Sequence, residues 1–154
     1  MPNSSVLTHL TSAKKEIDTS PTRFGELSDC SSLLGDREAL QQHMRDEGYL
    51  LFRGLLNRDD VMAARMSMLE KLAAEGHIDL NYPLADGVAS PTTRVAFKPE
   101  IAVKNPFVHN VVYEGPMMAM FEQFLGGAVR HFDFTWIRAV APGNSTPPHM
   151  DIVY

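Results

Sequence analysis

The stretch VRHFDFTWIRAVAPGNSTPPHMDIVY, residues 129–154, determines how the rest of this sequence is interpreted. Its apolar first half predicts a strand, a loop rich in Pro, Gly, Asn, Ser and Thr follows, and a second strand is expected to open at His149. Side chains two residues apart in a strand point to the same face, so His149 and Asp151 can bind one metal ion from one side. With one further imidazole, this donor set is the facial triad that holds Fe(II) in non-haem oxygenases.

The His-x-Asp pattern occurs three times in the sequence, starting at His77, His131 and His149. The bare pattern is weak evidence, and its surroundings must choose among the copies. His77 follows a helical pattern, which indicates a solvated loop. His131 lies in the apolar strand, where a hydrogen-bonded structural histidine is typical. The pair that begins at His149 follows a polar loop and is the best metal candidate.

Three segments carry a resemblance to a known family. The runs DFTWIRAVAPG (residues 133–143) and PHMDIVY (residues 148–154) resemble the first metal-binding segment of the phytanoyl-CoA dioxygenase family. EGYLLFRGLL (residues 47–56) is similar to a strand near the start of that family's domain. The likeness spans about residues 36–154. Members of the family are Fe(II)- and 2-oxoglutarate-dependent oxygenases built on a double-stranded β-helix.

The resemblance implies that His149 and Asp151 are metal ligands, and that the co-substrate is 2-oxoglutarate. It also indicates cofactor-binding candidates, which are Thr135, Trp136, Lys98 and Tyr154. Relatives that halogenate lack the carboxylate, so Asp151 favours hydroxylation. In the family the third ligand, a histidine, and the arginine that binds 2-oxoglutarate come later in the chain. The sequence is therefore expected to stop before a complete site.

Some alternatives remain open at the level of sequence. Strand parity groups Thr135 with Ile137 and Ala139 on one face and Phe134, Trp136 and Arg138 on the other. The resemblance implies a polar 2-oxoglutarate contact near Thr135, which favours the face of Thr135 as the pocket lining, and the face of Trp136 is the alternative. Lys98 is also consistent with an ordinary exposed lysine. His131 and His109 are the candidates for a third imidazole inside the chain.

The predicted fold is α+β, with N-terminal helices packed on the first strands of an incomplete double-stranded β-helix of jelly-roll type. Residues 1–33 form a loose lead-in, with a short strand near residues 23–27, and residues 34–154 form the N-terminal part of the domain. Capping residues and apolar spacing predict helices over residues 36–47, 57–76 and 115–125, and a short helix that starts at residues 105 and 106. Strands are expected over residues 49–52, 92–97 and 129–141. Residues 77–92 are expected to form a long loop that either roofs a substrate pocket or is a plain surface excursion.

The composition narrows the classes of partner. A net charge of −5 and a pI near 5.6 argue against nucleic acid, which favours a basic surface. No apolar run reaches the ~20 residues that span a bilayer, so no membrane partner is expected. The single cysteine, Cys30, favours a reducing compartment, and the cytoplasm is the expected location. The partner that fits best is a small-molecule substrate, a metabolite or an acyl thioester. A non-catalytic fragment or degenerate relative, and an unrelated α+β binding module, are the competing interpretations.

Overall fold

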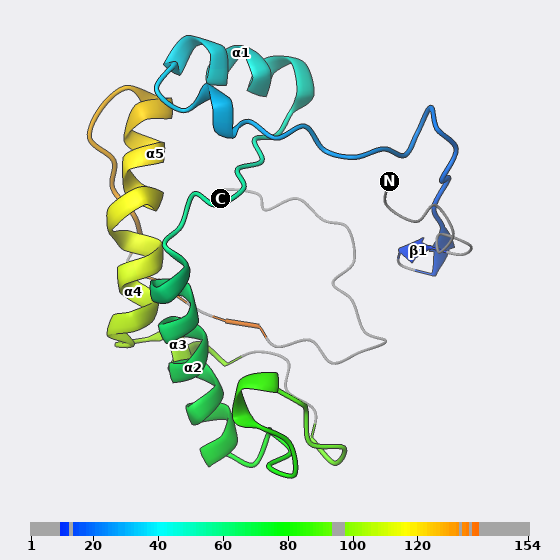
Figure 1. The fold of residues 1–154 in the computed structure, drawn as a ribbon, viewed down its shortest axis with the longest axis vertical. Helices are drawn as coiled ribbons and strands as arrows, with labels where there is room; N and C mark the ends of the chain where they lie inside the picture. The colour runs from blue at the N-terminus through cyan, green and yellow to red at the C-terminus, as the bar shows by residue number, and fades with distance from the viewer. Residues whose placement is uncertain (1–9, 13, 94–97, 133, 136, 139–154) are drawn as a thin grey trace. The chain divides into compact units, whose positions relative to one another are not determined.

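A computed structural model describes residues 10–12, 14–93, 98–132, 134, 135, 137 and 138 (Figure 1). The described residues belong to two separate compact units, divided between Leu27 and Ser28. The first unit contains a hairpin in which β1 (Thr11–Ser12) pairs antiparallel with β2 (Lys15–Glu16). The short strand expected near residues 23–27 is absent there, because turns and irregular backbone occupy these positions.

The first long helix confirms its predicted signals. Helix α1 (Arg37–Glu47) begins where the Asp36 carboxylate accepts a hydrogen bond from the Ala39 amide at 3.0 Å. It ends at Gly48, whose φ of 78° is costly for residues with a Cβ atom. Its inward face buries Leu40 completely. The short 3₁₀ helix η1 (Ser31–Leu33) precedes it.

Helix α2 (Arg58–Ala74) is the longest element among the described residues. Asn57 caps it by accepting the amides of Asp59 and Asp60, and both acidic residues lie in the first turn, where the helix dipole favours them. The apolar spacing of this helix is confirmed as core at Leu69 and Leu72, which are buried, whereas Met62 near its start is 39% exposed.

In the part of the chain that the structure describes, three further helices follow the loop after α2. They are α3 (Pro99–Ala102), α4 (Pro106–Tyr113) and α5 (Gly115–Leu125). Asn105 caps α4 and Gly126 ends α5, as their sequence signals predict. The loop contains the 3₁₀ helix η2 (Leu84–Asp86) and packs on α2, where the Arg65 guanidinium donates to the Ala85 carbonyl.

The core lies between α2 and the segments packed on it. Figure 1 shows α4 beside α2, and α5 running from α4 towards α1. One cluster contains Leu69, Leu72, Ile78 and Ile101, and a second contains Ala64, Ala102 and Val108. Ile137 packs against both clusters, so the segment after α5 is held against the helical layer. None of the helices in the described ranges is long and apolar enough to cross a bilayer.

The predicted strands are not found as strands among the described residues, in contrast to the predicted helices. Over residues 49–52 the structure has only an isolated parallel bridge between Leu51 and Asp29, so the prediction of a strand over these residues was wrong. Residues 94–97, most of the strand expected at 92–97, lie outside the described residues. Between residues 129 and 138 no described residue lies in a strand, although the Lys98 amide donates to the Ile137 carbonyl at 3.1 Å. A strand requires a hydrogen-bonded neighbour, and apolar alternation alone does not supply one. The double-stranded β-helix stays a prediction.

Candidate functional site

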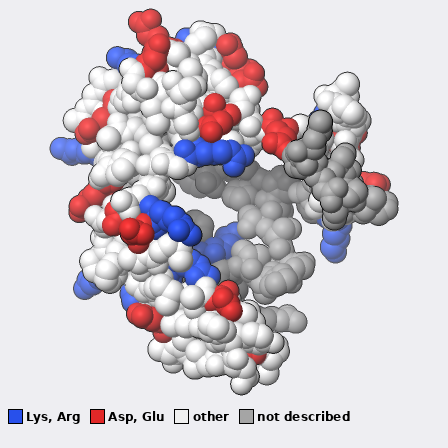
Figure 2. Space-filling view, in the orientation of Figure 1, with Lys and Arg blue, Asp and Glu red and all other residues white. Residues whose placement is uncertain are grey.

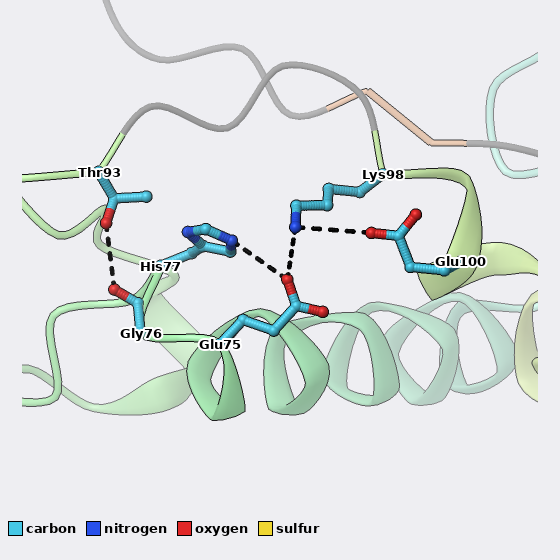
Figure 3. Close-up of polar contacts among 6 residues, drawn as sticks. All are labelled: Glu75, Gly76, His77, Thr93, Lys98 and Glu100. Atoms are coloured by element: carbon cyan, nitrogen blue, oxygen red, sulfur yellow. Dashed lines mark hydrogen bonds and ion pairs between the residues drawn. The ribbon is translucent and has the colours of Figure 1, made fainter.

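Charged side chains from two segments meet at the C-terminal end of α2 (Figure 3). The Lys98 ammonium lies 2.6 Å from a Glu75 carboxylate oxygen and 3.5 Å from Glu100. His77 Nε2 lies 3.2 Å from the same Glu75 oxygen. Thr93 donates to the Gly76 carbonyl beside them. The cluster therefore ties the segment before α3 to the end of α2.

The electrostatics of the cluster follow from this geometry. The hydrogen bond from Lys98 lowers the pKa of Glu75, and the same bond raises the pKa of Lys98. The predicted contact between Lys98 and 2-oxoglutarate stays a prediction, and the Lys98 ammonium is engaged by carboxylates here. The expectation of a solvated His77 was wrong, since its side chain is 17% exposed and contacts Glu75.

A cavity of about 250 Å³ lies between the α3–α4 region and the segment after α5. The His131 ring stacks on the Tyr113 ring at 3.7 Å between centroids, and the His109 ring meets Tyr113 edge-on at 5.4 Å. The Tyr113 hydroxyl lies 2.5 Å from the Thr135 hydroxyl and donates to the Phe132 carbonyl at 3.1 Å. The described residues that line the cavity are Val103, Lys104, His109, Tyr113, His131 and Thr135.

The segment after α5 shows the side-chain alternation that its sequence predicts. Thr135 bonds to Tyr113 of α4, and Ile137 packs against the helical core. Phe132 and Phe134 point outward and are 89% and 69% exposed. The favoured face therefore lies against helices, and its role in lining a 2-oxoglutarate pocket stays a prediction.

The structure brings His109 and His131 to one cavity, as a metal site shared between them would require. No group of three His, Cys, Asp or Glu side chains that could hold a metal occurs among the described residues. His149, Asp151, Trp136 and Tyr154 all lie outside the described residues. Whether the proposed ligands fit Fe(II) can therefore be judged only from the chemistry of their side chains. A neutral imidazole and a carboxylate with room for further ligands suit Fe(II).

Two residues with evident roles were missed at the level of sequence. Tyr113 organises the cavity, and its position four residues after His109 on a helical pattern places both on one helix face. That spacing could have signalled it. Glu75 organises the charged cluster, but its main partner lies 23 residues away. No local pattern could have indicated this pair.

Comparison with known proteins gives two informative similarities. The chain is 33% identical over 134 residues to a 1-deoxypentalenic acid 11-beta-hydroxylase of Streptomyces exfoliatus, which covers 82% of this chain and 46% of that protein. It is 30% identical over 142 residues to the protein of the same name from Streptomyces arenae, covering 85% of this chain and 48% of that protein. The chain thus spans about half the length of both relatives.

No protein-family model matches the chain. No solved structure matches it significantly. The two similarities nevertheless relate the chain to proteins named as hydroxylases, and so to oxygenases at a coarse level.

Proposed function

We propose that residues 1–154 belong to an Fe(II)- and 2-oxoglutarate-dependent dioxygenase of the phytanoyl-CoA dioxygenase type, which hydroxylates a small organic molecule. The observation that carries the proposal is the similarity to two named hydroxylases in a chain that also contains the His149-Met-Asp151 pattern. Each alone is weaker, because short patterns recur by chance and names of relatives do not identify ligands.

In this proposal the His149 imidazole and the Asp151 carboxylate hold the iron, and a histidine outside residues 1–154 completes the triad. When bound, iron and 2-oxoglutarate supply the oxidation: O₂, 2-oxoglutarate and a C–H bond give succinate, CO₂ and a C–OH group. The chain's own contribution is to bind, orient and exclude water. The Asp151 carboxylate occupies a position that a halide needs in halogenating relatives, so hydroxylation is the expected outcome.

Thr135, Trp136, Lys98 and Tyr154 remain the proposed contacts of the co-substrate. For Thr135 and Lys98, contacts in the structure indicate what a substitution or co-substrate binding would change. The Thr135 hydroxyl already bonds to Tyr113, so a substitution there will also loosen α4. The Lys98 ammonium is paired with Glu75, so it would have to exchange that carboxylate for one of 2-oxoglutarate.

The substrate proposed for this chain is a small-molecule acid or an acyl thioester. The relatives are named for an acid, 1-deoxypentalenic acid, which favours the first class. A cytoplasmic location is proposed as well, because Cys30 is a buried free thiol that suits a reducing compartment.

The test is succinate formation by the full natural protein with Fe(II), 2-oxoglutarate and a panel of small organic acids. His149→Ala and Asp151→Ala should each abolish turnover, because removal of either ligand leaves a site that does not hold iron. Fe(II) affinity, measured by equilibrium dialysis, should fall in the same variants.

The sequence offers a matched control in its first His-x-Asp copy. His77→Gln and Asp79→Asn change the same residue types at the same spacing, and both should retain iron and turnover. Equal losses at both copies would indicate damage to the fold. Full iron binding by His149→Ala would contradict the proposal and leave a non-catalytic relative as the better interpretation.

A further inference from the structure

Two adjoining hollows meet at helix α4. The cavity described above shares Tyr113 and His131 with a groove of about 410 Å³ that runs beside α4 and α5. Most of the groove is apolar. The described residues that line it are Val112, Tyr113, Met117, Met118, Phe121, Leu125, Val129, Arg130, His131, Phe132 and Phe134. Several of them are well exposed, among them Leu125 at 59% and Phe134 at 69%.

The charged side chains that line the two hollows in the described part of the chain are all cationic. No Asp or Glu occurs among the described residues that line them, whereas Lys104 and Arg130 do. Neither of these two cations forms an ion pair with another described residue. Figure 2 shows acidic and basic side chains interspersed on the visible face, and the chain as a whole carries a net charge of −5. Among the described residues, the linings of the two hollows are therefore richer in cations than the chain as a whole.

The polar groups of the cavity are suited to an anion. A lysine ammonium has three N–H donors and no acceptor, and a neutral imidazole retains one N–H donor. The His109 ring makes no hydrogen bond to another described residue, and its edge-on contact with Tyr113 orients it. Tyr113 is itself engaged with Thr135 and Phe132, so it forms a fixed wall.

We propose that the cavity and the groove together bind an elongated apolar molecule that carries a single acidic group. Lys104 and His109 bind the acidic group, and Met117, Met118 and Phe121 cover the apolar part. The positive charge of Lys104, beside the imidazole of His109, favours an anionic occupant over a neutral apolar segment of protein. The proposal goes beyond the oxygenase function, because neither iron nor turnover enters it.

The test is direct binding by isothermal titration calorimetry with three probes that share an eight-carbon chain and one short anion. Octanoate and octyl sulfate carry the acidic group, octan-1-ol lacks it, and acetate lacks the apolar part. Both long anions, or one of them, should bind more tightly than octan-1-ol, and acetate should not bind measurably. The head group preferred by the site identifies the class of acid.

Substitutions then test which residues bind the acidic group and which bind the apolar part. Lys104→Gln and His109→Ala should each weaken binding of the preferred anion by about five- to tenfold and leave octan-1-ol unchanged, as expected for loss of a charge-assisted hydrogen bond. Phe121→Gln should weaken the anion and the alcohol alike. Lys15→Gln in the first unit is the matched loss of a lysine, and it should change neither.

Several outcomes would overturn the proposal. Equal affinities for octanoate, octyl sulfate and octan-1-ol would show an apolar surface without anion recognition. No binding of any probe would assign the groove to contacts with protein. Unchanged anion affinity in Lys104→Gln, with unchanged circular dichroism, would place the acidic group elsewhere.

Discussion

Glu75 shows how much a single carboxylate can connect. One of its oxygens accepts from Lys98 at 2.6 Å and from His77 at 3.2 Å. These contacts join the end of α2 to residues that come after the loop, and they are made by side chains that are only partly exposed. Partly shielded pairs are weakened less by salt than fully exposed ones. The cluster is therefore expected to leave a measurable signature in the pH dependence of stability.

The pH prediction follows from the direction of the Glu75 shift. The pKa of Glu75 lies below its ordinary value of 4.5, chiefly because Lys98 donates a hydrogen bond to it. A carboxyl whose pKa is lower in the folded state stabilises the fold above the unfolded value, and this contribution is lost as pH falls through the folded value. Between pH about 5 and about 3, the urea midpoint should therefore fall more steeply for the unmodified protein than for Glu75→Gln.

The matched control is Glu70→Gln on the exposed side of the same helix, which should keep the steep dependence. The pKa of Lys98 is raised above 10.5, so its contribution is present below that value and is lost only as pH rises through the folded pKa. Parallel acid profiles for the unmodified protein and Glu75→Gln would show that the pair contributes nothing to stability.

Gly126 is a second position where a single added atom, a Cβ, is expected to change the stability of the fold. Its φ is 78°, and an added Cβ would lie 2.2 Å from the Arg37 guanidinium. Gly126→Ala should destabilise the fold by about 1–2 kcal/mol, mainly through the left-handed backbone, since the end of the arginine can move aside. Gly127→Ala, which meets nothing within 4 Å, should stay within about 0.5 kcal/mol. Thermal or urea unfolding of both variants checks this, and equal effects would contradict the assigned role of Gly126.

Among the helices, α4 depends most on one buried polar residue. Asn105 is 1% exposed, and its side-chain carbonyl oxygen accepts hydrogen bonds from the backbone amides of Phe107 and Val108. Its side-chain amide nitrogen donates to the Ser67 hydroxyl on α2 at 3.0 Å and to the Ile101 carbonyl at 3.3 Å. The residue that starts α4 thus also fastens it to α2, and it positions the His109 and Tyr113 face.

Comparing two asparagine caps tests this double role. Asn57 caps α2 from an exposed position, and its loss in Asn57→Ala should cost about 1 kcal/mol. Asn105→Ala removes a cap and leaves buried partners unsatisfied, so about 2–3 kcal/mol is expected. Denaturant unfolding of the two variants measures the difference. Similar losses would mean that the bond to Ser67 adds little.

At the scale of the complete protein, the chain and its relatives differ in length by about twofold. The outward-facing Phe132 and Phe134 are strongly exposed in the described part. An oxygenase of the proposed type would continue its sheet with further strands and supply a third imidazole. Both expectations concern residues that the matched segment of 134 or 142 residues does not include.

We expect residues 1–154 alone to form no succinate from 2-oxoglutarate in the presence of Fe(II), because two protein ligands do not hold the metal in the required geometry. The measurement is succinate release by this chain beside the full natural protein at equal concentration. Turnover by residues 1–154 would move the third ligand into the chain. His109 and His131, which share a cavity, would then be the first residues to substitute.

Local chemistry along the chain was sufficient to predict the starts of α1, α2 and α4 and the ends of α1 and α5, whereas α3 was not predicted. Asp36, Asn57 and Asn105 start helices because their short side chains accept amides that a first turn leaves unpaired, and Gly48 and Gly126 end them through positive φ. These interactions span a few residues, so sequence alone reveals them.

Only the tertiary structure decided which distant groups meet. The Glu75–Lys98 pair, the Asn105–Ser67 bond and the Tyr113–Thr135 contact join residues 22 to 38 positions apart. The strand predicted at residues 49–52 was reduced to a single bridge for the same reason, since a strand depends on a partner that its own residues do not specify. Packing of whole elements determines such pairs, and it placed Thr135 against α4, where alternation alone left both faces of its segment equivalent.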